Sequence, residues 1–212
     1  MAKIIIGLVG ETGSGKDTVA HYLKRRYNVQ LLRFSQPLKK ALDLFFAQSS
    51  KEDQSWLYSV FKDRFGEDVL HQGVRRYIEQ HDGLMCVNGM RMMKDLEFIR
   101  SFPNNYVIYV TADQDLRWKR VVSRGEKSDD KQTLEEFKKF EATAETEKDI
   151  PKIGAQADFK IVNNGSMDEL LWQVDDVMKE ILKKKQELEV LEGAPSADTT
   201  GGNDVHQSAV TD

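Results

Sequence analysis

The chain has 212 residues, of which 40% are hydrophobic, and this length suits one compact domain with a small appended subdomain better than two large domains. Lys and Arg total 31 against 35 Asp and Glu. The net charge of -4 gives no overall positive field, so we expect no nucleic-acid partner. No apolar run reaches the roughly 18 residues that a membrane span requires, so we expect no membrane association and a cytoplasmic location.

The first predicted element is a buried strand. Ile4–Val9 is a nearly continuous aliphatic run that stops at a glycine loop, which is typical of a parallel strand covered on both faces. A helical pattern follows over residues 18–27. Further strand candidates, separated by helical patterns, are residues 30–34, 84–87, 106–111 and 159–162. This alternation predicts an α/β fold with a central parallel sheet.

The middle section, residues 36–82, is mostly helical by pattern and long enough for a small helical subdomain. Its first helix is expected to place Leu38, Leu42, Phe45 and Phe46 on one face.

The end of the chain divides into a helix and a polar tail. Ser166 and Glu169 form a capping-box pattern that predicts the start of the last helix. From residue 193 to 212 the composition changes to small and polar residues, which cannot offset the entropy of ordering, so we expect a disordered tail.

The segment GETGSGKDT, residues 10–18, lies between the first predicted strand and helix and matches the phosphate-binding Walker A pattern, with Gly10, Gly15 and Lys16 in register. Backbone N–H groups at the start of a helix converge on phosphate oxygens, and the helix dipole favours their negative charge. The pattern predicts an ATP site. The residues expected to bind the nucleotide are Gly10, Glu11, Thr12, Gly13, Ser14, Gly15, Lys16, Asp17 and Thr18.

Within this loop, Lys16 is the expected catalytic point charge on the outer phosphates. The usual hydroxyl residue after the lysine is replaced by Asp17, and Thr18 supplies a hydroxyl one position later. We therefore expect Thr18 and Asp17 to contact Mg²⁺, directly or through water. A plain glycine turn is the structural alternative. A dinucleotide fold is disfavoured because its glycine spacing is absent.

Several segments in a fixed order carry a family resemblance. They are GETGSGKDT, FSQPLKKAL at 34–42, RFGEDVL at 64–70, VNGMR at 87–91, RGEKSDD at 124–130 and ADFKIVNNGSMDEL at 157–170. The chain resembles P-loop nucleotide kinases related to adenylate kinase and dephospho-CoA kinase, and most closely an uncharacterised kinase-like family best known from archaea.

The likeness covers Lys3 to about Leu182 and implies a P-loop NTPase three-layer sandwich with a central parallel sheet, so we expect one such domain over residues 1–192. It also implies a substrate-side helical insertion at about 36–82 and a lid at about 117–150.

The resemblance also implies roles for charged residues. Asn88 stands where such families carry an acidic residue near the acceptor and magnesium, and Arg91 matches the arginine that grips the acceptor's phosphate. Arg117, Arg120 and Arg124 share a helical face that is expected to close over the phosphates, with Arg120 and Arg124 as catalytic arginines.

The acceptor-side candidates come from the helical middle section and the strand before it. They are Phe34, Ser35, Lys39, Arg64, Arg75 and Arg76.

No other residue type forms a convincing site. The four histidines show no metal-ligand spacing, and Cys86 alternates with methionines in a strand pattern that predicts a buried, inert thiol.

Two functions stay open. The first is an ATP- and Mg²⁺-dependent kinase, a monomer or homodimer, whose small phosphorylated acceptor is a nucleoside or deoxynucleoside monophosphate or dephospho-CoA. The second is an ATP-binding regulatory protein with little transferase activity, which Asn88 favours. A nucleic-acid 5′-end kinase would need a basic groove that the acidic balance does not indicate.

Overall fold

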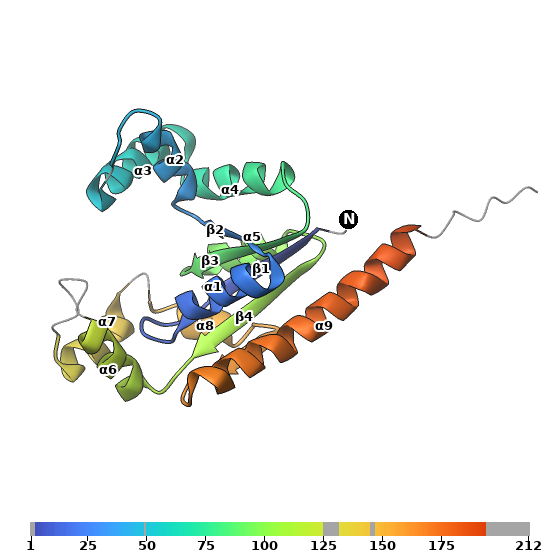
Figure 1. Ribbon diagram of the computed structural model, residues 1–212. Coiled ribbons are helices and arrows are strands. Elements are labelled where there is room, and N and C mark those ends of the chain that lie inside the picture. Colours follow the sequence, from blue (N-terminus) through green and yellow to red (C-terminus); the bar gives the residue numbers. More distant parts are fainter. Residues whose placement is uncertain (1–2, 49, 125–131, 145–146, 194–212) are drawn as a thin grey trace, which may run out of the picture.

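The computed structural model describes residues 3–48, 50–124, 132–144 and 147–193. Within these residues, parallel strands form one five-stranded sheet in the order β2-β3-β1-β4-β5 (Figure 1). The strands are β1 (Ile4–Val9), β2 (Gln30–Arg33), β3 (Leu84–Met90), β4 (Asn105–Thr111) and β5 (Phe159–Val162). The predicted parallel sheet is confirmed. β3 continues three residues beyond its expected end at Val87, so Asn88 lies within the strand.

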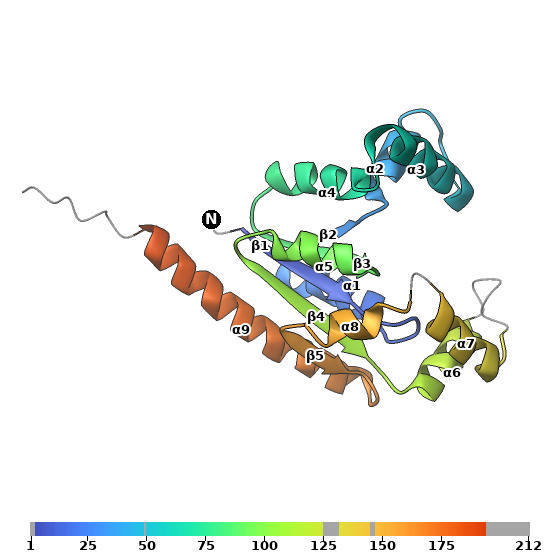
Figure 2. The ribbon, with the colours of Figure 1, turned by 180° about the vertical axis from the view of Figure 1, so that it is seen from behind.

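Helices cover both faces of the sheet and make the three layers of the predicted sandwich (Figures 1 and 2). On one face lie α1 (Lys16–Tyr27) and α9 (Met167–Gly193). On the other lie α4 (Val69–Glu79), α5 (Met93–Arg100) and α8 (Ile150–Gly154). A hydrophobic core lies on each face of the sheet, and alternate residues of β1 belong to one or the other. Ile4, Ile6 and Leu8 pack toward α1 and α9, whereas Ile5 and Val9 pack toward α5.

The position of β1 determines where a ligand can bind. Every residue of β1 is buried, and the strand pairs with β3 on one side and β4 on the other. Because all the strands are parallel, their carboxyl ends meet at one edge of the sheet. The loop after β1 therefore lies beside the ends of β3 and β4, which is the usual ligand-binding edge of such sheets.

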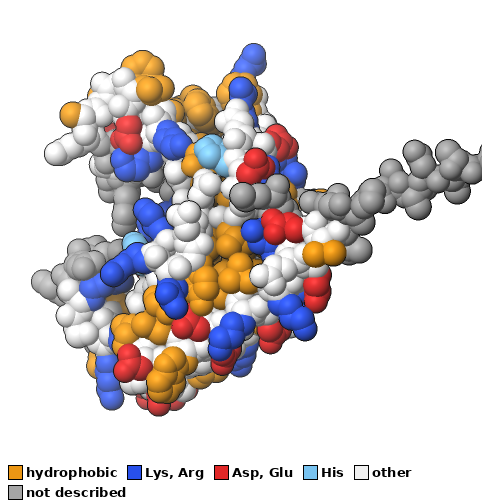
Figure 3. All heavy atoms as spheres, turned by 45° about the vertical axis from the view of Figure 1, so that its right-hand side comes forward, with side chains coloured by type: hydrophobic (Ala, Val, Ile, Leu, Met, Phe, Trp, Pro, Cys, Tyr) orange, Lys and Arg blue, Asp and Glu red, His pale blue; other side chains and the backbone are white. Residues whose placement is uncertain are grey.

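Two helices stand away from the sheet and form a separate lobe, α2 (Gln36–Asp43) and α3 (Lys51–Phe65) (Figure 1). Leu38 and Leu42 are buried as expected, but Phe45 and Phe46 are 80% and 58% exposed. The expectation of one shared face is wrong here because α2 ends at Asp43, so the helical period does not continue to the two phenylalanines. Figure 3 shows hydrophobic side chains at the surface of this lobe.

The last helix begins as predicted. Ser166 N–H donates to Glu169 Oε2, and Glu169 N–H donates to Ser166 Oγ. α9 includes Gly193, and the rest of the predicted tail lies outside the described residues. In the described part of the chain, no helix is both long and apolar enough to cross a membrane.

The contact between β1 and α5 leaves no room for a side chain at Gly7. A Cβ at this position would lie 2.6 Å from Met90 Sδ and 3.1 Å from Ile99 Cγ1. We expect Gly7→Ala to lower the free energy of unfolding by about 1–3 kcal/mol, measured by urea denaturation. Shortening the neighbour in a Met90→Val background should reduce that loss, and an equal loss in both backgrounds would contradict this explanation.

Candidate functional site

The loop between β1 and α1 turns at positions that only glycine accommodates. Gly13 and Gly15 have φ angles of 81° and 91°, in the left-handed region that side chains disfavour. A Cβ on Gly10 would lie 2.3 Å from the backbone oxygen of Val110 in β4. The loop therefore passes close against the sheet edge, and its backbone N–H groups lie at the start of α1.

The end of β5 holds this loop from behind. Asn163, which is buried, donates from Nδ2 to the backbone oxygen of Ser14 at 2.9 Å. A Cβ on Gly15 would lie 2.3 Å from the same nitrogen, so the absence of a side chain at Gly15 leaves space for the Asn163 amide. Sequence reasoning gave Asn163 no role, although its place directly after the fifth strand was a signal that could have found it.

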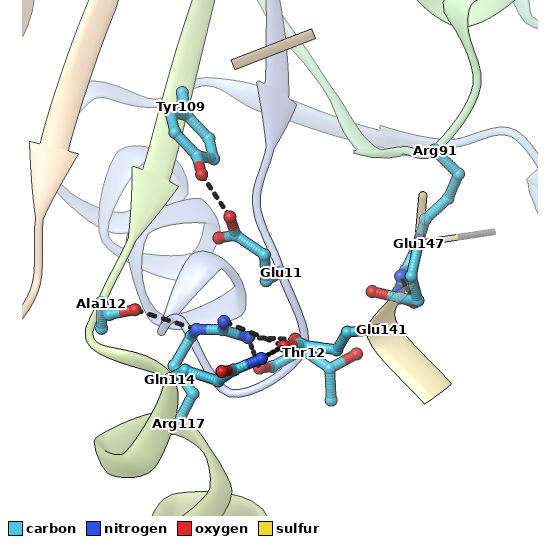
Figure 4. A network of polar contacts seen from close by, with 9 residues as sticks. All are labelled: Glu11, Thr12, Arg91, Tyr109, Ala112, Gln114, Arg117, Glu141 and Glu147. Carbon is cyan, nitrogen blue, oxygen red and sulfur yellow. Dashed lines mark hydrogen bonds and ion pairs between the residues drawn. The ribbon is translucent and has the colours of Figure 1, made fainter. Parts of the chain in front are cut away.

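A second support reaches the loop from β4 (Figure 4). The Tyr109 hydroxyl donates to Glu11 Oε1. Burial raises the pKa of Tyr109 to about 12, and the hydrogen bond to Glu11 adds to the shift, so the phenol stays protonated and remains a donor. Glu11 keeps its other oxygen, Oε2, buried without a hydrogen-bond partner.

Arg117 of α6 (Gln114–Arg124) also supports the loop (Figure 4). Its Nε donates to the backbone oxygen of Ala112 at 2.9 Å, and Nη1 donates to the backbone oxygen of Thr12 at 3.3 Å. Its guanidinium pairs with Glu141 of α7 (Leu134–Thr143). Arg117 is buried, so the expectation that it shares an open face with Arg120 and Arg124 is wrong for Arg117.

A cavity of about 410 Å³ opens over the loop. Its lining brings together most of the predicted nucleotide-binding residues and three arginines, one that follows β3 and two from α6: Glu11, Thr12, Gly13, Gly15, Lys16, Asp17, Thr18, Arg91, Arg120 and Arg124. The expected lid segment continues into residues 125–131, which lie outside the described residues.

Lys16 lies at the base of this cavity with its side chain only 11% exposed. Burial lowers the pKa of Lys16, and the neighbouring Asp17 carboxylate opposes this shift. A cation in such a partly desolvated position interacts strongly with an anion that enters the cavity.

Asp17 links Lys16 with the two strands on the other side of the site. Its Oδ1 accepts a hydrogen bond from Asn88 Nδ2 at 2.8 Å and lies 3.6 Å from Lys16 Nζ and 3.7 Å from Arg33 Nη2. Burial acts to raise the pKa of Asp17, but Lys16, Asn88 and Arg33 together outweigh it and leave the pKa below its usual value. Asp17 is therefore a stable anion.

These residues fit a hard cation such as Mg²⁺. Asn88 is buried, and its Oδ1 has no hydrogen-bond partner. With Asp17 and Thr18, it offers the oxygen ligands that Mg²⁺ prefers. Among the described residues no group of three or more His, Cys, Asp or Glu could hold a metal ion.

Arg91 follows the end of β3, and its guanidinium pairs with Glu147, which precedes α8 (Figure 4). Glu147 is buried, and its Oε2 has no hydrogen-bond partner. Burial raises the pKa of Glu147, while the charge of Arg91 acts against the shift. The pair holds Arg91 at the wall of the loop cavity. Sequence reasoning missed Glu147 because it lies in a segment without a recognisable motif.

A larger cavity of about 810 Å³ lies between β2 and the α2–α3 lobe. Arg33, which pairs with Asp17, lines it together with Ser35, Lys39 and Tyr58. Lys39 also pairs with Asp43 at 2.8 Å.

The remaining acceptor-side candidates are dispersed. Phe34 packs against His71 and Phe98 in place of lining the large cavity, and Arg76 lines a neighbouring cavity of about 230 Å³. Arg75 lies over the Phe102 ring and donates to Ser101, whereas Arg64 is exposed on α3 and lines none of these cavities.

Comparisons with known proteins agree with this architecture. A family model described as an AAA domain matches residues 6–145. A UPF0200 protein of Methanocaldococcus jannaschii is 23% identical over 189 residues, which cover 84% of this chain and 91% of that protein. TT1252 from Thermus thermophilus has a similar structure with 21% identity and a TM-score of 0.55, covering 85% of this chain and 98% of its own.

Shikimate kinase from Acinetobacter baumannii, solved in complex with shikimate, has 16% identity and a TM-score of 0.52, covering 87% of this chain and 96% of its own. At such identities these likenesses show the fold alone.

The buried pair of Arg117 and Glu141 gives a stability test. We expect Arg117→Met to lower the free energy of unfolding by about 3 kcal/mol, because Glu141, whose side chain is 11% exposed, would lose its cationic partner and keep only the hydrogen bond from Gln114. Arg117→Met with Glu141→Leu should recover most of this loss, as measured by urea denaturation. The exposed pair of Lys138 and Asp115 is the control, and Lys138→Met should cost less than about 1 kcal/mol. An equally small loss for Arg117→Met would mean that the pair with Glu141 stabilises the fold no more than an exposed ion pair does.

Proposed function

The chain belongs to the AAA domain family, whose model covers residues 6–145, and on this premise we propose that the protein is an ATP-dependent phosphotransferase that acts on a small phosphorylated acceptor. One observation carries the proposal: Lys16, whose side chain is only 11% exposed, directly follows the glycine loop and lines the same cavity as Arg91, Arg120 and Arg124. A fixed set of cations around a phosphate-sized space is what phosphoryl transfer requires, since the reaction depends on positioning and on stabilising charge.

The donor side follows from the loop. The backbone N–H groups at the start of α1 and the Lys16 ammonium bind the outer phosphates of ATP. Arg120 and Arg124 of α6 stabilise the charge on the transferring group. Asp17, Thr18 and Asn88 would hold Mg²⁺, which when bound neutralises phosphate charge and orients the phosphate oxygens.

The acceptor side follows from the large cavity beside the loop. Arg33 lines it and also pairs with Asp17, so the two cavities adjoin at this contact. Arg91 grips the acceptor's phosphate bidentately, and Ser35 and Lys39 bind the remainder of the acceptor. The volume of about 810 Å³ and the cationic lining suit a nucleoside or deoxynucleoside monophosphate, or dephospho-CoA.

A second candidate is an ATP-binding regulatory protein with little transferase activity. Asn88 favours it, because an uncharged amide stands where related kinases carry a carboxylate. ADP release measured across ribonucleotides, deoxynucleotides and dephospho-CoA distinguishes the two functions. ATP binding without turnover of any acceptor would favour the regulatory function.

The lysine under the loop gives the most direct test of the proposed kinase activity. We expect Lys16→Ala to lower the turnover of ATP by roughly 10²-fold or more, because the reacting phosphate loses a preorganised charge. Lys24 is an exposed lysine on the same helix, so Lys24→Ala serves as the matched control and should leave turnover unchanged. Equal rates for Lys16→Ala and the unchanged protein in a coupled ADP-release assay would refute the role of Lys16.

Asn88→Asp tests whether this position faces the cation. Without Mg²⁺, the variant should unfold more easily by about 1–3 kcal/mol, because a hydrogen bond to Asp17 becomes a contact between two carboxylates. Adding Mg²⁺ should stabilise the variant more than the parent, as measured by thermal unfolding in EDTA and in Mg²⁺. The exchanged pair, Asp17→Asn with Asn88→Asp, should restore the Mg²⁺-free stability. If Mg²⁺ stabilises the parent and the variant equally, Asn88 does not face the cation.

A further inference from the structure

His71, in the first turn of α4, forms a partly buried pair with Asp95 of α5. Its Nε2 lies 2.9 Å from Asp95 Oδ1. The other oxygen of Asp95, Oδ2, accepts hydrogen bonds from the backbone N–H groups of Arg91 at 2.7 Å and Met92 at 3.0 Å. Asp95 is only 7% exposed, so its position depends on these three donors and not on water. The Asp95 carboxylate therefore links the His71 ring to the backbone of Arg91.

The other side of the His71 ring packs against the acceptor side of the molecule. The ring centroid lies 5.0 Å from that of Phe34 and 5.1 Å from that of Phe98. Phe34 directly precedes Ser35, which lines the large cavity. A single side chain thus contacts both the segment that begins α2 and the carboxylate that holds Arg91.

We propose that His71 is a positioning residue for Arg91: by holding Asp95, it fixes the turn from β3 into α5, and this turn directs the arginine at the acceptor's phosphate. The inference rests on the proposed function, since it takes Arg91 as the group that meets the acceptor. It adds a link from the start of α2 to the arginine. A shift of Phe34 when the large cavity fills would move His71, then Asp95 and the Arg91 backbone.

The surroundings of His71 favour this role. Its Nδ1 is buried and has no hydrogen-bond partner, and Asp68 Oδ1 lies 4.0 Å away, so the ring depends on Asp95 for its one hydrogen bond. The guanidinium of Arg91 pairs with Glu147. Both ends of the arginine therefore have buried carboxylate partners, Asp95 at its backbone and Glu147 at its side chain.

Amide substitutions can separate the hydrogen bond from the space that the ring fills. In His71→Gln, the side-chain nitrogen lies as far along the side chain as Nε2 and can still donate to Asp95. In His71→Asn, the nitrogen corresponds to Nδ1 and does not reach Asp95. His71→Leu keeps the apolar contact with Phe34 and Phe98 but removes the donor.

Two measurements on the full chain test the link from His71 through Asp95 to Arg91. The first is hydrogen exchange of the Arg91 and Met92 amides by NMR. The second is the affinity for inorganic phosphate in protein saturated with a non-hydrolysable ATP analogue and Mg²⁺. We expect His71→Leu and His71→Asn to accelerate exchange of both amides and to weaken phosphate binding, each about tenfold, while His71→Gln stays within about threefold of the parent.

Two results would overturn the inference: unchanged exchange and phosphate affinity in His71→Leu, or equal losses in His71→Gln and His71→Asn, which would indicate a packing role alone. If the leucine variant does not fold, the comparison of the two amide variants decides. Failure of the unchanged protein to bind the ATP analogue would contradict the proposed function. The exchange comparison in nucleotide-free protein still decides whether His71 holds the Arg91 backbone.

Discussion

The close contact between Gly10 and β4 is the constraint on which the site depends. The chain leaves β1 so near to the Val110 carbonyl that a side chain at Gly10 would collide with the backbone. The loop consequently turns at the edge of the sheet, where the ends of β3 and β4 flank it. The Val110 carbonyl belongs to a strand that is hydrogen-bonded within the sheet, so it cannot move independently of the core. The loop that packs against it is therefore held rigidly, together with its N–H groups.

Further polar contacts fix the loop without occupying its cavity. Asn163 holds the Ser14 carbonyl, Arg117 holds the Thr12 carbonyl, and Tyr109 holds the Glu11 carboxylate. These groups come from the residue after β5, from α6 and from β4, which contact different parts of the loop. A ligand that binds to a loop held in this way loses little free energy to ordering the protein, because the binding conformation is already formed.

Charge at the site is balanced in pairs that draw on separate segments. Asp17 accompanies Lys16 and Arg33, and Glu147 accompanies Arg91. Without these carboxylates the three cations would repel one another, and the largely buried Lys16 would be costly to desolvate. Under the proposed function, an incoming phosphate would compete with the Glu147 carboxylate for Arg91. The arginine is thus held in place before the ligand arrives, and the turn that carries it is fixed by Asp95.

The sequence by itself determined the fold and the centre of the site. Strand and helix patterns have short periods, and the glycine loop is a local motif, so Ile4–Val9, Gly10, Gly15 and Lys16 could be recognised without knowing any distant contact. The buried state of Cys86 and the capped start of the last helix were predictable for the same reason.

Only the tertiary structure decided which residues serve the loop from a distance. The helical spacing of Arg117 and Arg120 predicts that they share one face of α6. Arg117 is nevertheless buried against Glu141, because α7 packs on that side. The partners Glu147, Asn163 and His71 lie far along the chain from the groups they hold, 56 residues from Arg91, 149 from Ser14 and 24 from Asp95. No local pattern encodes such contacts, since they arise only when the sheet brings the carboxyl ends of its strands together.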